Sequence, residues 1–132
     1  MALDVGTRRI GVAVGEGTFA FPHSTLERTN VRDDVARIVA LAAERGVRTI
    51  VVGDPLTMSG ERGIASAAID AFVAHLARAY EGEVERVDER LTTAAAQKSL
   101  IAADVSRAKR KRVVDQLAAV GILETWLARR PR

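Results

Sequence analysis

Three carboxylates occupy positions in this sequence from which they could do chemistry together. Asp4 lies where a first short strand ends, Glu89 follows a later strand, and Asp115 belongs to the last predicted helix. The chain has no cysteine, which excludes disulfides and thiolate metal sites. His23 has no second candidate ligand at a metal-site spacing, and His75 is interpreted as ordinary surface. Carboxylates remain, so an oxygen-ligated metal is the kind of site that this composition favours.

Two of these carboxylates also have simpler interpretations. Asp4 could start the turn that follows it, as Asp often does. Asp115 shares a helix side with three apolar residues, so its charge must be paired or bound to a metal. A salt bridge to an arginine nearby in the sequence would satisfy that requirement as well as a metal would. The three apolar residues are Ala118, Ala119 and Ile122.

The strands that would position these acids are predicted from hydrophobic periodicity. Alternating apolar residues on both sides of a glycine-containing turn predict a hairpin over residues 1–14, and residues 19–27 continue it as a third strand. The β-branched run 49–52 predicts a strand buried on both faces, parallel to the first. Residues 84–87 add a further strand and complete a βαβ unit. This arrangement would bring Asp4 and Glu89 to one edge of one sheet.

Four helices are predicted from apolar stripes and capping residues. The first begins after Asn30 and ends before Gly46. Thr92 or Thr93 caps an alanine-rich helix, and the last helix begins at Ser106. The remaining helix, between the two parallel strands, is predicted from a stripe at a spacing of four residues. That stripe consists of Ile64, Ala68, Phe72 and Leu76.

Length and charge restrict the class of protein. The chain of 132 residues fits a single domain, 1–132, with a substantial core. It has no apolar run of about eighteen residues and no signal peptide, so a soluble cytoplasmic protein without membrane contact is expected. The formal net charge is +3, but it is unevenly distributed. The residues from Ser106 onward hold eight Lys or Arg and two Asp or Glu, so this segment has a net charge of +6. The net charge of residues 1–105 is therefore −3. A basic pole is typical of nucleic-acid binding, although charge runs are often solvated surface.

Four motifs follow one another along the chain. They are Leu-Asp-Val-Gly-Thr-Arg-Arg-Ile-Gly-Val-Ala-Val at 3–14, Val-Val-Gly-Asp-Pro-Leu at 51–56, Asp-Glu-Arg-Leu-Thr-Thr at 88–93, and Val-Ser-Arg with Lys-Arg-Lys-Arg-Val-Val-Asp-Gln-Leu-Ala-Ala-Val between 105 and 120. In this order they resemble the motifs of the YqgF (RuvX) family of RNase H-like nucleases. The resemblance extends from Leu3 to about Leu127.

The resemblance implies an α/β, RNase H-like fold. Its sheet is mixed and five-stranded, with three antiparallel strands, then two strands parallel to the first, and helices on both faces. It also implies a nuclease that depends on Mg²⁺ or Mn²⁺, in a family associated with trimming the 5′ end of pre-16S ribosomal RNA and with Holliday junction resolution. The catalytic and metal-binding acids of the family fall on Asp4, Glu89 and Asp115. Two metal ions roughly 3.5–4 Å apart can activate water and stabilise the leaving oxygen, so no protein nucleophile is required.

Cations near these acids are the candidates for binding nucleic acid, either precursor rRNA or branched DNA. No aromatic residue alternates with the basic cluster, so contacts to phosphates are expected rather than to bases. The candidates are Arg8, Arg9, Arg90, Arg107, Lys109, Arg110, Lys111 and Arg112.

The chain departs from the family pattern in the loop after residue 53. Asp54 replaces the usual leucine and Thr57 the usual asparagine, so Asp54 could add a ligand or cap a turn. Relatives also have a longer lead-in before the first acid than the three residues here, so the first strand could be clipped.

Two other functions compete with a nuclease. The Asp-x-Gly-Thr hairpin also resembles the phosphate loop of actin-like ATPases and sugar kinases, but those enzymes need two such domains. A catalytically silent nucleic-acid-binding module is the third hypothesis, and the three acids weigh against it. An aromatic content of 4% and the lack of a spare apolar helix face predict a monomer or weak homodimer. A single active site suffices to trim an RNA end, which favours that substrate over a junction.

Overall fold

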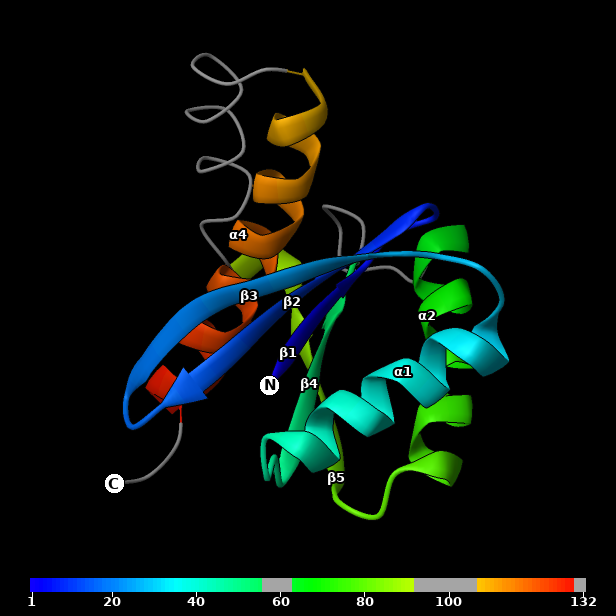
Figure 1. The fold of residues 1–132 in the computed structure, drawn as a ribbon, viewed down its shortest axis with the longest axis horizontal. Helices are drawn as coiled ribbons and strands as arrows, with labels where there is room; N and C mark the ends of the chain where they lie inside the picture. Colours follow the sequence, from blue (N-terminus) through cyan, green and yellow to red (C-terminus); the bar gives the residue numbers. More distant parts are fainter. Residues whose placement is uncertain (56–62, 92–106, 130–132) are drawn as a thin grey trace.

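The computed structural model describes residues 1–55, 63–91 and 107–129, which form a mixed sheet with helices on both faces (Figure 1). The strand order is β3-β2-β1-β4-β5. Strand β1 pairs antiparallel with β2, and β2 with β3, whereas β4 runs parallel to both β1 and β5. This confirms the five-stranded mixed sheet that was predicted. The strands are β1 (Ala2–Val5), β2 (Arg9–Glu16), β3 (Phe19–Glu27), β4 (Thr49–Asp54) and β5 (Glu83–Asp88).

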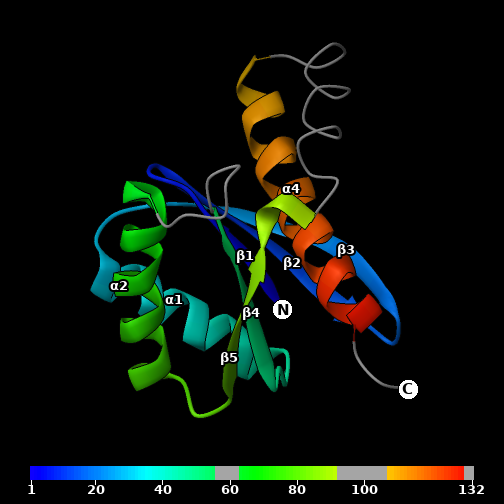
Figure 2. The same cartoon turned by 180° about the vertical axis from the view of Figure 1, so that it is seen from behind.

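Helices α1 and α2 cover one face of the sheet, and α4 covers the other (Figures 1 and 2). The predicted alanine-rich helix that begins near Thr92 lies outside the described residues. No helix in the described ranges is both long and apolar enough to cross a membrane. The helices are α1 (Val31–Glu44), α2 (Ile64–Ala79), the short 3₁₀ helix η1 (Glu89–Leu91) and α4 (Arg107–Arg129).

The two faces of the sheet carry side chains of different size. Strand residues alternate between faces, so Leu3 joins the core beneath α1 and α2 while Ala2 joins the core beneath α4. Large side chains such as Ile10 and Val12 also face α1 and α2. Ala13 and Gly11 of β2 fall on the α4 face by the same alternation. Small residues let the backbone of α4 come close to the sheet.

The strand predicted to be buried on both faces is β4. Ile50, Val51 and Val52 are fully buried. Ile50 and Val52 pack in the core beneath α1 and α2, and Val51 packs in the core beneath α4. This confirms the interpretation of the continuous β-branched run as a central parallel strand.

The first helix agrees with its prediction, but the stripe predicted for α2 is wrong at its start. The side chain of Asn30 caps α1 by accepting a hydrogen bond from the backbone N–H of Asp33 at 2.9 Å. In α2, Ile64 is 93% exposed and Ala68 is also exposed. The helix turns every 3.6 residues, so a stripe at a fixed spacing of four drifts off the buried face. The buried residues of α2 are Ser66, Ile69, Phe72 and Leu76.

Candidate active site

Asp4 projects from the middle of the sheet toward α4. The alternation along β1 places Asp4 on the same face as Ala2, which packs beneath α4. Its partner across the antiparallel pair is Gly11 of β2. On the other side, Leu3 pairs with Val52 of β4, so the next residue, Gly53, lies at the level of Asp4. Asp4 is therefore flanked on both neighbouring strands by a residue without a side chain.

The space over Gly11 is taken by Asp115. A Cβ atom on Gly11 would overlap the backbone carbonyl of Asp115 and come within 3.0 Å of the Asp115 Cβ atom. Only glycine permits α4 to lie this close to β2, because any side chain would meet backbone rather than a flexible side chain. The consequence is that α4 delivers its acid directly above the strand that pairs with Asp4.

The space over Gly53 is taken by Glu89. A Cβ atom on Gly53 would lie 2.5 Å from Oε1 of Glu89 and 2.5 Å from Cδ1 of Ile122. Gly53 pairs with Val87 of β5, and η1 begins two residues later with Glu89. The end of β5 thus turns the Glu89 carboxylate back over β4. The three predicted acids come from β1, η1 and α4 and meet the same face of the sheet.

The Asp115 carboxylate is paired with a cation that is distant in the sequence. Nε of Arg9 donates a hydrogen bond to Oδ2 of Asp115 at 2.7 Å, and both side chains are largely buried. The sequence left open whether Asp115 is salt-bridged or metal-bound. The structure shows a salt bridge, made by an arginine of β2 rather than by one of the nearby arginines of the helix. Ala118, Ala119 and Ile122 are buried beneath it, as the stripe predicted.

The oxygen atoms of Asp4, Glu89 and Asp115 are of the type that binds a hard cation, but in the described residues these acids do not form a closed cluster. Within residues 1–55, 63–91 and 107–129, no three Asp, Glu, His or Cys side chains are grouped as a metal site. One reason is visible at Asp115, whose Oδ2 atom faces Arg9. The three acids offer only carboxylate oxygens, which Mg²⁺ and Mn²⁺ prefer. The acids therefore suit such an ion by the type of their donor atoms.

Comparison with known sequences identifies the family of this chain. The sequence model of the RuvX family, described as "Holliday junction resolvase", matches residues 1–129. The chain belongs to the RuvX family. Three relatives bear the name "Putative pre-16S rRNA nuclease". That of Myxococcus xanthus is 46% identical over 99% of this chain and 89% of its own length. That of Chloroflexus aggregans is 47% identical over 96% of this chain and 91% of its own length. That of Clostridium perfringens is 39% identical over 98% of this chain and 96% of its own length.

In this RuvX protein, the arginine of the Asp-Glu-Arg motif binds the acid next to Glu89. The side chain and the backbone N–H of Arg90 both donate to the carboxylate of Asp88, with Nε 3.0 Å from Oδ1. These bonds, with a smaller contribution from the charge of Arg129, hold the pKa of Asp88 below its usual value. Arg90 nevertheless stays exposed, so it combines a bond to Asp88 with access to solvent.

Asp54 has a structural role in this protein. It ends β4, is buried, and accepts a hydrogen bond from Oγ of Ser66 at 2.7 Å. Nη2 of Arg86 lies 3.0 Å from the other carboxylate oxygen. Asp54 thereby joins β4 to the start of α2 and to β5. The two alternatives from the sequence, an added ligand and a turn cap, stay predictions, because residues 56–62 lie outside the described part of the chain.

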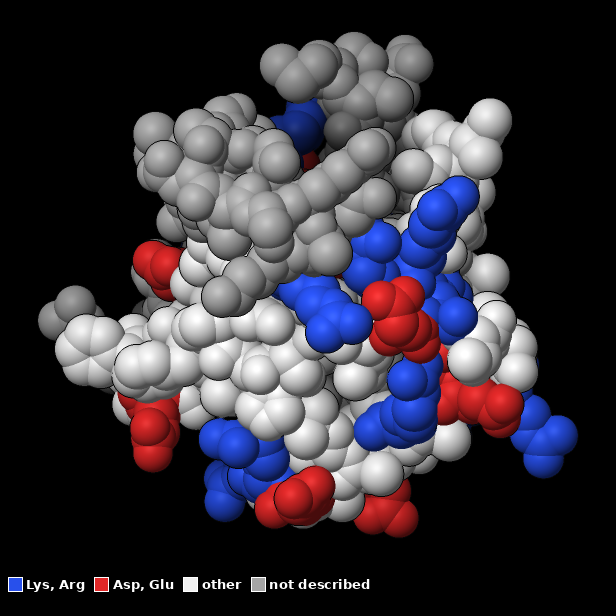
Figure 3. Space-filling view, turned by 45° about the horizontal axis from the view of Figure 1, so that its top comes forward, with Lys and Arg blue, Asp and Glu red and all other residues white. Residues whose placement is uncertain are grey.

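The predicted phosphate-binding cations lie around the acids as far as the structure describes them. Arg8 and Arg112 are exposed, and Arg9 is occupied by Asp115. In the view of Figure 3, several Lys and Arg side chains gather to the right of the centre, with a few acids among them. The backbone of residues 107–111 forms the first turns of α4, as expected for the basic run. Their side chains, those of Arg107, Lys109, Arg110 and Lys111, lie outside the described part.

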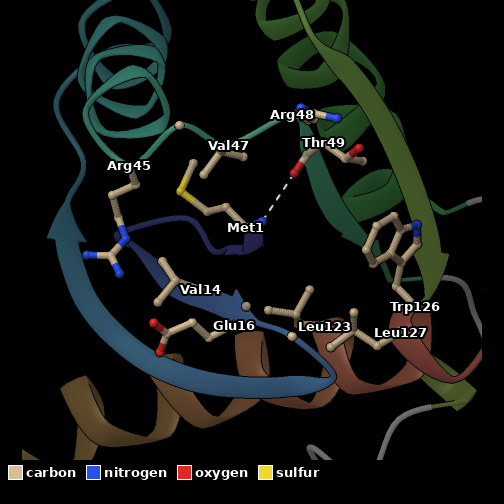
Figure 4. A pocket seen from close by; sticks show the side chains of 13 residues that line it. Met1, Val14, Glu16, Arg45, Val47, Arg48, Thr49, Leu123, Trp126 and Leu127 are labelled. Atoms are coloured by element: carbon tan, nitrogen blue, oxygen red, sulfur yellow. Dashed lines mark hydrogen bonds between the residues drawn. The ribbon is translucent and has the colours of Figure 1, made fainter.

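A cavity of about 380 Å³ lies at the opposite end of the sheet from the acids (Figure 4). It is lined by Met1 at the start of β1 and by Leu123, Trp126 and Leu127 in the second half of α4. The amino group of Met1 donates to the carbonyl of Thr49, and burial lowers its pKa to about 6. Trp126 packs against the core beneath α4. None of the three acids lines this cavity.

Sequence reasoning missed one buried acid, which lies in α1 on the opposite face of the sheet from α4. Asp34 in the first turn of α1 is fully buried and receives hydrogen bonds from Arg28 and Arg37. An acid in the first turn of a helix is common because it suits the helix dipole, so its position gave no separate signal. The partners lie three and six residues away, but only the packing of α1 on the sheet buries the charge.

Proposed function

We propose that this RuvX-family protein is a cytoplasmic, metal-dependent nuclease that trims the 5′ end of precursor 16S rRNA. The observation that carries the proposal is the approach of Asp115 and Glu89 to the sheet over Gly11 and Gly53, on either side of Asp4. The names of the relatives support the choice of RNA as substrate.

Asp4, Glu89 and Asp115 are the residues that would hold Mg²⁺ or Mn²⁺. When bound, such an ion lowers the pKa of a water molecule and stabilises the leaving oxygen of a phosphodiester. The protein supplies carboxylate oxygens from β1, η1 and α4, and the packing of these elements on the sheet sets the direction from which each carboxylate approaches. Arg9 offsets part of the mutual repulsion of these acids through its bond to Asp115. The cations at the start of α4 would bind the phosphates that flank the cleaved bond.

Holliday junction resolution is the second candidate, and the description of the family model favours it. Symmetric cleavage of a four-way junction requires two active sites held in a fixed dimer. A monomer with one site can process an RNA end. The choice between the two candidates therefore depends on oligomeric state as well as on substrate.

The substrate test uses purified protein with Mn²⁺ on two molecules in parallel: RNA with a 5′ leader and a synthetic four-way DNA junction. We expect a monomer by light scattering that shortens the leader and leaves the junction intact. Paired, symmetric nicks in the junction by a stable dimer that ignores the RNA would establish the second candidate instead. No cleavage of either substrate would leave the silent binding module as the explanation.

Metal binding has its own test, which does not require activity. We expect Mn²⁺ to raise the melting temperature of the unsubstituted protein, since a ligand at one hundred times its Kd stabilises by about 2.7 kcal/mol. Asp4→Asn should abolish this shift and most turnover. Glu124→Gln, which removes an exposed acid of α4, is the control and should keep both. An Asp4→Asn protein with full Mn²⁺-dependent cleavage would refute the assignment.

A further inference from the structure

We infer that Arg28 is a positioning residue for the acid site, anchored by buried Asp34 and acting through the turn that connects β1 to β2. The inference rests on the proposed function, because it concerns how Asp4 and Arg9 are held for that reaction. None of the four motifs includes Arg28 or Asp34.

Asp34 provides a rigid anchor. Its side chain is 0% exposed. Oδ2 accepts a hydrogen bond from Nε of Arg28 at 3.1 Å, and Oδ1 accepts from Nη2 of Arg37 at 2.7 Å and from the backbone N–H of Thr29 at 3.0 Å. Burial by itself would raise the pKa of Asp34, but these bonds together hold the pKa below its usual value. Loss of any of these hydrogen bonds would leave the buried charge of Asp34 partly unpaired, which is costly, so the carboxylate is held in one position.

Arg28 connects this anchor to the turn at two points. Its Nη1 atom donates to the carbonyl of Gly6 at 2.9 Å, and its backbone N–H donates to the carbonyl of Arg8 at 2.8 Å. Its guanidinium group also lies over the ring of Phe72, with Cζ 5.5 Å from the ring centre. The planar guanidinium can reach a carbonyl and a carboxylate at once, which a lysine ammonium cannot do with the same geometry.

The turn held in this way lies between two residues of the site. It is closed by a hydrogen bond from the N–H of Gly6 to the carbonyl of Arg9 at 2.9 Å. Asp4 precedes it by two residues, and Arg9 ends it and binds Asp115. The contacts thus run from the α1 side of the sheet, through Arg28 and the turn, to the acids on the α4 side. A displacement of the turn would move both Asp4 and Arg9.

The chain offers a matched control in Arg37. Arg37 binds the same carboxylate as Arg28, but its second hydrogen bond goes to the carbonyl of Glu27 rather than to the turn. If Arg28 serves stability alone, substitution of either arginine should have the same consequences. If Arg28 positions the turn, only its substitution should affect the site.

The experiment compares Arg28→Gln with Arg37→Gln in the full chain. We expect both variants to unfold at a lower urea concentration. Only Arg28→Gln should lower kcat, by about 10- to 100-fold with KM little changed, as displacement of catalytic groups by about 1 Å can do. It should also weaken Mn²⁺ binding measured by calorimetry and speed hydrogen exchange of the Gly6 amide. Arg28→Lys keeps the charge next to Asp34, so it should recover stability while kcat stays below that of Arg37→Gln.

Equal kcat and equal Gly6 exchange in the two glutamine variants would overturn the inference and reduce Arg28 to a stabilising residue. If Arg28→Gln does not fold, the comparison of Arg28→Lys with Arg37→Lys decides the question by the same measurements. Failure of the proposed function gives a different result: the unsubstituted protein and Arg37→Gln would then both lack Mn²⁺-dependent cleavage. That outcome would remove the role of Arg28 together with the reaction that it serves.

Discussion

Arg9 and Asp115 are 106 residues apart in the sequence, and Nε of Arg9 lies 2.7 Å from Oδ2 of Asp115. The bond links β2 to α4 at the point where Gly11 lets the helix backbone approach the sheet. It holds one of the three predicted ligands in place and partly neutralises it. The same pair therefore contributes to stability and to the electrostatics of the site.

Removal of this pair should destabilise the protein in the absence of metal. We expect Arg9→Gln to lower the free energy of unfolding by about 1–3 kcal/mol, because the Asp115 charge then loses a hydrogen bond to a charged group. Urea denaturation in the presence of a chelator measures the change. The exposed neighbour Arg8 is the control, and Arg8→Gln should stay within about 0.5 kcal/mol of the unsubstituted protein. Equal losses in the two variants would show that the Arg9 bond adds nothing to stability.

Substitution of the two glycines next to Asp4 should have different effects. Gly11→Ala places a methyl group against the backbone of Asp115, which cannot give way, so we expect a loss of about 1–3 kcal/mol or more in stability. Gly53→Ala meets the ends of the Glu89 and Ile122 side chains, which can move. We expect Gly53→Ala to keep more stability than Gly11→Ala and to lose turnover through displacement of Glu89.

The control for both variants is Gly15→Ala. A Cβ atom on Gly15 would have its nearest neighbour at 3.6 Å, an ordinary contact. Thermal unfolding and cleavage assays on the three proteins give the comparison. If Gly53→Ala retains the turnover of Gly15→Ala, the approach of Glu89 over β4 is unimportant for catalysis.

The buried Asp34 should make stability depend on acid pH. Its pKa in the folded protein lies below its usual value, so the folded state binds fewer protons than the unfolded state in the interval between the two pKa values. The stabilisation is fully present above about pH 4 and is lost as pH falls through the folded-state pKa.

This dependence can be measured with Asp34→Asn. At pH 7 we expect the variant to be less stable by about 3 kcal/mol, because it leaves two arginines without their carboxylate. At pH 3 the difference should be smaller. Asp33→Asn removes the exposed acid next to it and serves as the control. A stability difference between Asp34→Asn and the unsubstituted protein that is the same at both pH values would contradict the assigned pKa direction.

The basic start of α4 should contribute to nucleic-acid affinity through phosphates. Replacement of Lys109 and Arg112 by glutamine should reduce the slope of log affinity against log salt by about two units, since each neutralised phosphate contributes roughly one. Arg45 and Arg48 line the cavity at the far end of the sheet and provide a control with the same change in charge. Filter binding over a range of salt concentrations measures the slopes. An unchanged slope in the first variant would assign the cluster to solvated surface.

Local pattern was sufficient to predict most of the framework. The period of two in residues 1–14 and the β-branched run at 49–52 predicted strands β1, β2 and β4, and Asn30 marked the start of α1. These signals work because strand and helix periods are set by neighbours along the chain. The apolar stripe of α2 was misplaced at Ile64 and Ala68, since a fixed spacing of four residues drifts off the buried face of a helix with 3.6 residues per turn. The motifs likewise marked Asp4, Glu89 and Asp115 as candidates.

Only the tertiary structure decided how these residues meet. Whether Asp115 is paired depended on Arg9 of β2, and its approach depended on an absent side chain at Gly11. The anchoring of the turn by Asp34 through Arg28 arose when α1 packed on the sheet and buried the carboxylate. Contacts of this kind join segments that are far apart in sequence or lie on different elements. Periodicity and motif spacing describe each segment separately, so the distances between them are set by packing alone.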